Sequence, residues 1–256
     1  MKPAALLASG LLLLGLLAPG EAGAEQPVRI AIIIDDMGYQ ASLDRAILDL
    51  PEALAVAIIP DAPNATQLAR AAEAQARETL IHLPLAGKRH DHCKLALECI
   101  GPDWPLGEIV AYLETALETV PGAMGFNNHQ GSRFTSDERA VEKLIQGITW
   151  LNLERDAPLS VIDSRTTATT HLESAAREAG IPNARRRVFL DHDDDPEKIR
   201  EAWQDLLDLA RYHGHAVAIG HPRHNTLEVL REKLPGLAEE AVSLVPVSEL
   251  LEQPGR

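Results

Sequence analysis

The sequence predicts a single-domain α/β fold in which strands and helices alternate about seven or eight times. Short apolar runs rich in β-branched residues alternate with stretches whose apolar residues have helical spacing. Polar residues then follow the strand-like runs repeatedly. An alternating series of this length builds a (β/α) barrel or a doubly wound sheet. No G-x-G-x-x-G follows the first strand, which disfavours a dinucleotide-binding site.

The first strand is predicted at residues 28–34, because this run is apolar except for Arg29 and most of its residues are β-branched. Such a run is typical of a strand buried on both faces. Asp35 and Asp36 follow directly, where the strand leaves the core. The two acids of such a pair can have separate roles: one binds a metal, and the other accepts a proton from metal-bound water. Alone, an acid pair before a glycine is more often a solvated turn.

The next elements follow the same two patterns. Residues 42–50 have helical spacing and stop before Pro51, and residues 53–59 form a second buried-strand run. Residues 65–77 are alanine-rich and strongly helical, and residues 79–83 form a short apolar strand.

The remaining elements complete the alternation, with Ser136 expected to cap a helix, Gly180 ending another and Pro196 in the first turn of a third. The helices are predicted at 106–120, 136–154, 171–180, 195–212, 226–234 and 248–252. The strands are predicted at 122–128, 159–162, 187–190, 215–219 and 242–245.

The first 24 residues have the features of a secretory signal peptide. Lys2 precedes an apolar run at 6–18, and Ala22-Gly23-Ala24 has the small-residue pattern of a cleavage site. An uncleaved anchor is the alternative, since about 17 apolar residues can just cross a bilayer. We expect cleavage, one domain over residues 25–256, no stable membrane span afterwards, and a periplasmic protein.

The charge of the chain limits its partners. The formal net charge is −14 at pH 7, which disfavours nucleic acid and anionic membranes. Neutral glycans remain compatible.

Cys93 and Cys99 are the only two cysteines. In an oxidising compartment a local disulfide between them is the favoured interpretation. A metal site with His90 and His92 is the rival, but the cysteines lack the usual zinc-site spacing.

Ligand-type residues stand at the ends of several predicted strands. In a barrel these ends converge on one mouth. Two or three imidazoles with a carboxylate are typical of a zinc or other divalent transition-metal site, although each histidine taken singly is more often a cap or a surface residue. The residues are Asp35, Asp36, His82, Asn128, His129, Asp163, Asp191, His192 and His221.

Two charged runs have simpler interpretations. The acids within residues 191–195 are expected to cap the helix that begins near Pro196 and to favour its positive end. Arg185, Arg186 and Arg187 are expected to form a solvated run before a strand.

The order of the motifs resembles that of the divergent polysaccharide deacetylases, a branch of the NodB-like carbohydrate esterases. The resemblance covers essentially all of the mature chain. It implies a distorted (β/α)7-8 barrel and metal-dependent hydrolysis of an acetamide on a sugar. The motifs are Ile-Asp-Asp-Met-Gly at 34–38, His-Leu-Pro-Leu at 82–85, Gly-Phe-Asn-Asn-His-Gln-Gly-Ser at 125–132, Asp-Ser at 163–164 and Ile-Gly-His-Pro at 219–222.

The resemblance also implies roles for individual residues. Asp35 corresponds to the general base, Asp36 and His82 to metal ligands, and His221 to the acid that protonates the leaving amine. Ala86 stands where the family has its second metal histidine, so we predict His129 as the replacement from its place at a strand end. The arginine that orients the base in the family has no counterpart in the sequence. Zinc is the first expectation for the metal.

Three further residues are predicted near the substrate. Asn128 is a candidate for stabilising an oxyanion. Asp163, with Ser164, is expected either to hold an imidazole in one tautomer or to bind substrate hydroxyls. The alternative for Asp163 is a cap for the segment that follows.

The sequence therefore predicts a metal-dependent hydrolase that removes N-acetyl groups from an envelope or extracellular polysaccharide. A catalytically degenerate protein that binds glycans or organises the envelope is the alternative. A hydrolase for another ester or amide is a third possibility, because the geometry of such a site does not determine which acyl group is removed.

Overall fold

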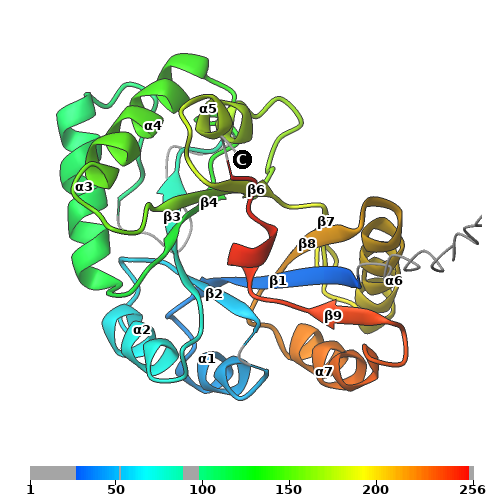
Figure 1. The fold of residues 1–256 in the computed structure, drawn as a ribbon. Coiled ribbons are helices and arrows are strands. Elements are labelled where there is room, and N and C mark those ends of the chain that lie inside the picture. Colours follow the sequence, from blue (N-terminus) through cyan, green and yellow to red (C-terminus); the bar gives the residue numbers. More distant parts are fainter. Residues whose placement is uncertain (1–26, 52, 89–97, 254–256) are drawn as a thin grey trace, which may run out of the picture.

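The computed structural model describes residues 27–51, 53–88 and 98–253, where strands and helices alternate as predicted (Figure 1). The strands are β1 (Val28–Met37), β2 (Ala55–Ile58), β3 (Thr79–Leu85), β4 (Gly125–Gln130), β5 (Ser160–Asp163), β6 (Asn183–Arg185), β7 (Val188–Phe189), β8 (His215–Gly220) and β9 (Val242–Leu244). The helices are α1 (Ala41–Leu48), α2 (Ala65–Glu73), α3 (Leu106–Thr119), α4 (Glu138–Asn152), α5 (Leu172–Glu178), α6 (Pro196–His213) and α7 (His224–Lys233), with short 3-10 turns η1 (Leu234–Gly236) and η2 (Val247–Leu250).

The strands form one curled, parallel sheet. Its order is β6-β5-β4-β3-β2-β1-β8-β7, and β9 pairs with the start of β1. A short link joins the two ends of the sheet: the Arg186 N–H donates to the Asp163 carbonyl on β5, and the Arg187 N–H donates to the Val217 carbonyl on β8. The sheet is thus a distorted barrel, which confirms the fold class predicted from the sequence.

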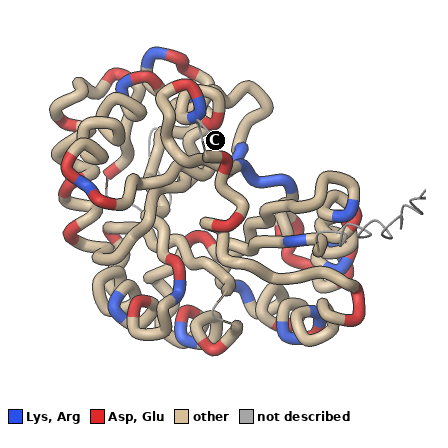
Figure 2. The backbone as a smooth tube through the Cα atoms, in the orientation of Figure 1, with Lys and Arg blue, Asp and Glu red and all other residues tan. Residues whose placement is uncertain are grey.

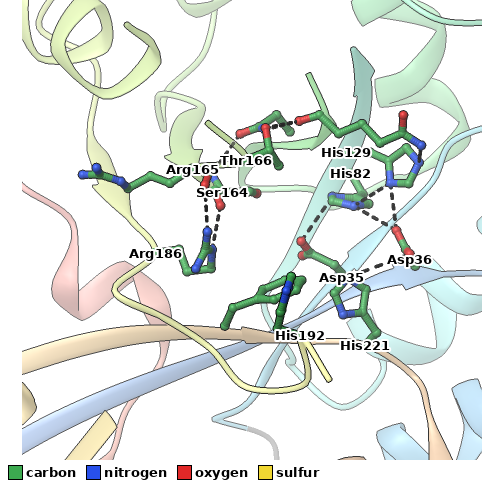
Figure 3. Close-up of a pocket in the computed structure, with 13 residues that line it drawn as sticks. Asp35, Asp36, His82, His129, Ser164, Arg165, Thr166, Arg186, His192 and His221 are labelled. Atoms are coloured by element: carbon green, nitrogen blue, oxygen red, sulfur yellow. Dashed lines mark hydrogen bonds and ion pairs between the residues drawn. The ribbon is translucent and has the colours of Figure 1, made fainter. Parts of the chain in front are cut away.

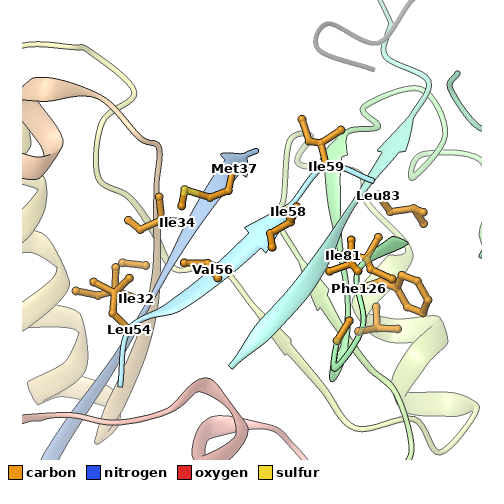
Figure 4. Packing of buried hydrophobic residues seen from close by; sticks show 14 of the residues in the cluster. Ile32, Ile34, Met37, Leu54, Val56, Ile58, Ile59, Ile81, Leu83 and Phe126 are labelled. Atoms are coloured by element: carbon orange, nitrogen blue, oxygen red, sulfur yellow. The ribbon is translucent and has the colours of Figure 1, made fainter. Parts of the chain in front are cut away.

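Hydrophobic side chains fill both sides of the sheet. On β1, Ile32 and Ile34 pack outward against the helices, whereas Ala31 and Ile33 face the barrel interior, as the two-residue period of a strand requires (Figure 4). Four of the residues in this interior cluster are alanines.

The C-terminal segment closes one end of the barrel. Val247 and Leu250 of η2 are buried in the interior cluster. The Ser248 N–H donates to the carboxylate of Glu78, which immediately precedes β3. The segment therefore covers the amino ends of the strands, and the carboxyl ends remain for a site.

Local differences from the predicted elements have simple causes. Strand β6 was not predicted, because two of its three residues, Asn183 and Arg185, are polar and it contains no apolar run. Asp137 rather than Ser136 caps α4, its carboxylate accepting from the Ala140 N–H at 3.1 Å. Asp195 caps α6 as expected.

Several sequence predictions fall partly or wholly outside the described residues. These include the signal peptide at 1–24, Cys93, His90 and His92. Cys99 is described and is disulfide-bonded. Within the described ranges, no helix is both long and apolar enough to cross a membrane.

Candidate active site

A cavity of about 580 Å³ opens at the carboxyl ends of the strands (Figure 3). Its walls come from the ends of β1, β3 and β4, the loop after β5, β7, and the segments that follow β7 and β8. A site at this end of the barrel was predicted from the sequence, because the carboxyl ends of parallel strands converge there.

Both acids of the Asp35-Asp36 pair reach the cavity, although adjacent strand residues normally point to opposite faces. The β1–β2 pairing is irregular between Ile34 and Met37, and Asp36 has a φ of 56°. This left-handed conformation is unusual for a residue other than glycine. It turns the Asp36 carboxylate toward the cavity beside Asp35.

Asp36, His82 and His129 form a compact set of ligand atoms. Asp36 Oδ1 lies 2.8 Å from His129 Nδ1 and 3.1 Å from His82 Nε2, and the two nitrogens are 3.1 Å apart. Tetrahedral ligands about 2.0–2.1 Å from an ion would be separated by about 3.3 Å. The three atoms therefore have nearly the spacing that one small divalent cation requires.

The state of Asp36 Oδ1 also fits a metal ligand. This oxygen is buried and makes no hydrogen bond of acceptable geometry within the described part of the chain. A buried carboxylate oxygen without a donor is costly, and a cation would satisfy it. One carboxylate with two imidazoles is a common donor set for zinc and related metals. The residues present thus fit a divalent transition metal.

Asn127, which was not predicted from the sequence, connects Asp35 with the metal ligand His82. Its Nδ2 donates to Asp35 Oδ1 at 2.6 Å, and its Oδ1 accepts from His82 Nδ1–H at 2.9 Å. The second bond leaves His82 Nε2 as the lone-pair nitrogen, which a metal ligand needs. Asn127 lies beside His82 in the β3–β4 register and two residues before His129. That spacing was the available signal.

The electrostatics of the pocket follow from its burial and its paired charges. Burial raises the pKa of Asp35, although His82 and His221 oppose the shift. Burial also disfavours charge on Asp36 and His82. The contacts of the Asp36 carboxylate with His129 and His82 nevertheless hold the pKa of Asp36 below its usual range, and Asp35 and Asp36 raise the pKa of His82 to about 9. The acids therefore attract positive charge to the point where a cation would sit.

His221 lies on the opposite side of the pocket from β3 and is held by Asp191. His221 Nδ1–H donates to Asp191 Oδ1 at 2.8 Å, and the His221 backbone N–H donates to Oδ2 at 2.7 Å. Thr226 Oγ1 donates to the same Oδ2. Nε2 is left facing the pocket, 3.9 Å from Asp36 Oδ2.

The sequence interpretation of Asp191 as one of several helix-capping acids was wrong. Asp195 alone accepts from the first-turn N–H groups of α6, whereas Asp191 is fully buried beneath His221. Burial raises the pKa of the Asp191 carboxyl, but its hydrogen bonds with His221 lower it overall, and the same contact raises the pKa of His221.

The three residues predicted near the substrate lie close together. Asn128 lines the cavity, but both polar atoms of its side chain bond to the backbone. Nδ2 donates to the Gln130 carbonyl, and Oδ1 accepts from the Ser164 N–H. Asp163 braces the loop after β5, accepting from the Arg165 N–H and from Thr170 Oγ1. It holds no imidazole among the described residues, so the capping alternative describes its contacts.

Arg186 belongs to the cavity wall, and the expectation of a solvated run was wrong for it. Its Nε donates to the Ser164 carbonyl at 2.6 Å and its Nη2 to the Arg165 carbonyl at 2.8 Å. The guanidinium carbon lies 4.9 Å from the centre of the Phe189 ring. The run turns inward because Arg186 lies in the link that closes the barrel.

The sequence matches a known family and a curated relative. Residues 32–251 match the family described as divergent polysaccharide deacetylase. The chain is 35% identical over 242 residues to the uncharacterized protein YibQ of Escherichia coli (strain K12), an alignment that covers 94% of this chain and 72% of that protein.

Solved structures share the fold. The uncharacterized protein ATU2773 from Agrobacterium tumefaciens C58 superposes with a TM-score of 0.81 at 19% identity, covering 90% of this chain and 91% of that one. The Xyl-CE4 domain of a multidomain xylanase from the hindgut metagenome of Trinervitermes trinervoides gives 0.51 at 12% identity, covering 88% and 89%. With the family match over most of its length, the chain belongs to the divergent polysaccharide deacetylase family and has the fold of the NodB-like deacetylases.

Proposed function

We propose that this protein is a metal-dependent hydrolase that removes N-acetyl groups from a polysaccharide of the cell envelope. One observation carries the proposal: a single pocket brings the ligand set of Asp36, His82 and His129 together with the buried Asp35 carboxylate and the His221 imidazole. Family membership supports a glycan as the substrate. The apolar sequence at 6–18 and the disulfide at Cys99 support a periplasmic location.

Asp36, His82 and His129 would hold the metal, with zinc the first candidate for this donor set. A bound divalent ion supplies Lewis acidity, which polarises an acyl oxygen and makes a nearby water more acidic. Asn127 fixes the tautomer of His82 by accepting from its Nδ1–H.

Asp35 is the proposed general base. Its carboxylate is buried beside the ligand set, and Asn127 Nδ2 holds Oδ1, so Oδ2 is the oxygen that accepts a proton from the attacking water. Burial raises its pKa, which makes the carboxylate a stronger base than one exposed to solvent.

His221 is the proposed general acid. Asp191 accepts from Nδ1–H and thereby keeps the proton of the neutral ring on that nitrogen, while Nε2 faces the pocket. When protonated, Nε2–H donates to the departing nitrogen as the C–N bond breaks. Asp191 stabilises the protonated ring and raises the pKa of His221.

The proposal is tested by measuring bound zinc and acetate release from N-acetylglucosamine oligomers. We expect nearly one zinc per wild-type chain, loss of zinc in His129→Ala, and retained zinc with at least a hundredfold slower acetate release in Asp35→Asn. His213→Ala is the control, because this exposed histidine ends α6 away from the cavity. A wild-type protein that binds no divalent metal after supplementation contradicts the mechanism.

The non-catalytic alternative makes a different prediction. Ala86 stands in place of the second family histidine, which is the observation in its favour. Saturable glycan binding by the zinc-loaded wild type without acetate release, unchanged in Asp35→Asn, would support a binding protein.

A further inference from the structure

We infer that the wall of the cavity formed by Ser164 and Arg186 is a subsite for a carboxylate, so that the preferred substrate is an acetamido sugar that carries an acid group. The inference rests on the proposed function and names its substrate class. Both side chains line the same cavity as the metal ligands (Figure 3). Ser164 follows β5 and Arg186 follows β6, on the side of β4 away from β3.

The Ser164 hydroxyl is a donor that has no partner in the part of the chain that the structure describes. The residue is only 5% exposed, yet Oγ makes no hydrogen bond within the described ranges. Its backbone groups are both used, the N–H by Asn128 Oδ1 and the carbonyl by Arg186 Nε. A buried hydroxyl left unpaired is costly. A ligand in the cavity would satisfy it.

The Arg186 guanidinium is fixed in position but not neutralised. Two carbonyls and the face of Phe189 hold it, and among the described residues no carboxylate forms an ion pair with it and Nη1 has no hydrogen-bond partner. Burial lowers the pKa of this guanidinium, so the protein maintains the cation at a cost in free energy. A fixed guanidinium loses little entropy when it binds a carboxylate.

The loop after β5 is shaped to hold these groups. Arg165 has a φ of 48°, an unfavourable conformation for this residue type. Its N–H is tied to Asp163 Oδ1 at 2.8 Å, which directs its carbonyl to Arg186 Nη2. Thr166 Oγ1 donates to the Gln130 carbonyl at 2.6 Å and joins the loop to the end of β4. Such strain persists only where the surrounding contacts hold it.

The local charge favours a single anion. A divalent ion would balance Asp35 and Asp36, which leaves the Arg186 guanidinium at the cavity wall without a carboxylate in ion-pair contact among the described residues. Figure 2 shows this basic link against a backbone on which acids are widespread. Because the whole chain carries −14, a long polyanion is disfavoured, whereas one carboxylate can enter.

A carboxylate matches the available donors in number. Arg186 Nη1 and Ser164 Oγ–H are two donors, and a carboxylate has two oxygens to accept from them. A phosphate would leave oxygens without donors at this wall. The acid group would belong to the sugar that carries the acetamide, because the same cavity holds the ligand set.

The test compares ligands that differ only in the acid group. N-acetylmuramic acid and its methyl ester would be titrated calorimetrically into the zinc-loaded Asp35→Asn variant, which prevents turnover during binding. We expect the acid to bind at least tenfold more tightly than the ester. The additional change Arg186→Gln or Ser164→Ala should remove most of that preference, and Arg186→Lys should restore only part of it because lysine lacks the planar fork.

Arg187→Gln is the matched control, because this neighbour does not line the cavity. It should keep the preference. Zinc content and thermal unfolding, measured for every variant, would show that each is folded and loaded. Equal affinity for the acid and the ester would overturn the inference.

The two proposals fail separately. If neutral N-acetylglucosamine oligomers are deacetylated and Arg186→Gln does not change that rate or the ligand preference, the hydrolase stands and the carboxylate subsite is refuted. If the acid is preferred but no glycan is deacetylated, the subsite stands and the hydrolase is refuted. If free acetate binds as tightly as the acidic sugar, Ser164 and Arg186 form a site for small anions rather than for an acidic sugar, and the inference is overturned.

Discussion

At the scale of single residues, the site depends on side chains that touch no substrate. Asn127 holds both Asp35 and His82, and Asp191 holds His221. Each is buried and each has its polar atoms committed to a functional residue. Their contribution is orientation and protonation state rather than direct chemistry.

The first residue-scale prediction concerns Asn127. Asn127→Ala should weaken zinc binding by about 10- to 100-fold, because His82 loses the acceptor that fixes its tautomer. Competition with a chromogenic chelator measures the affinity. Asn225→Ala is the control, since the Asn225 side chain contacts Asp194 outside the cavity. Unchanged zinc affinity in Asn127→Ala would show that the hydrogen bond does not orient the ligand.

The second concerns the pH dependence of activity. The proposed acid, His221, works only when protonated, and Asp191 raises its pKa. Asp191→Asn removes the negative charge, so the pKa of His221 falls and activity is lost at a lower pH on the alkaline side. The profile of kcat/KM against pH would show the shift. An alkaline limb that stays in place would contradict the role of His221 as the acid.

At the scale of elements, the close pairing of β4 and β5 couples stability to the metal site. Gly125 begins β4, and a Cβ on it would collide with the backbone and side chain of Ser160 on β5. The same strand carries Asn127 and His129. A shift of β4 would therefore move two residues of the site.

Gly125→Ala should destabilise the protein by about 1–3 kcal/mol and also lower its zinc content, because relief of the overlap displaces β4. Urea unfolding and elemental analysis measure the two effects. Gly107→Ala is the matched control: Gly107 lies in α3 and its Cβ would meet no atom within 4 Å. If the variant loses stability but keeps its full zinc content, zinc binding does not depend on the pairing of β4 with β5.

At the scale of the whole molecule, the ligands come from strands that are distant in sequence but close together in the sheet. Asp36 lies near the end of β1, whereas His82 and His129 belong to the neighbouring strands β3 and β4, and only β2 separates β1 from β3. A metal that binds only when these strands are assembled stabilises the folded state by mass action. The stabilisation should therefore be measurable as a change in global unfolding.

Zinc at about a thousand times its dissociation constant should stabilise the fold by about 4 kcal/mol. The midpoint of thermal unfolding should consequently fall by several degrees after chelation and recover when zinc is returned. His129→Ala should show almost no response to either treatment, because it lacks one of the three ligands. An equal response in this variant would place the stabilising metal elsewhere.

The sequence was sufficient for the alternation of elements, the distorted barrel and the placement of the ligand-type residues. Short apolar runs predicted eight of the nine strands formed by the described residues, because a strand buried on both faces needs apolar side chains. The positions at strand ends predicted that Asp36, His82 and His129 would meet, since parallel strands end on the same side. These properties are local, or follow from topology alone.

Only the tertiary structure decided which polar residues hold one another. Asp191 resembled a helix cap and Arg186 a solvated base, yet one lies beneath His221 and the other lines the cavity. Their partners are separated from them by about 20 to 30 residues, and the unpaired Ser164 hydroxyl has no sequence signature at all. Hydrogen bonding acts over about 3 Å, so such partnerships depend on exact side-chain positions that the folded barrel alone provides.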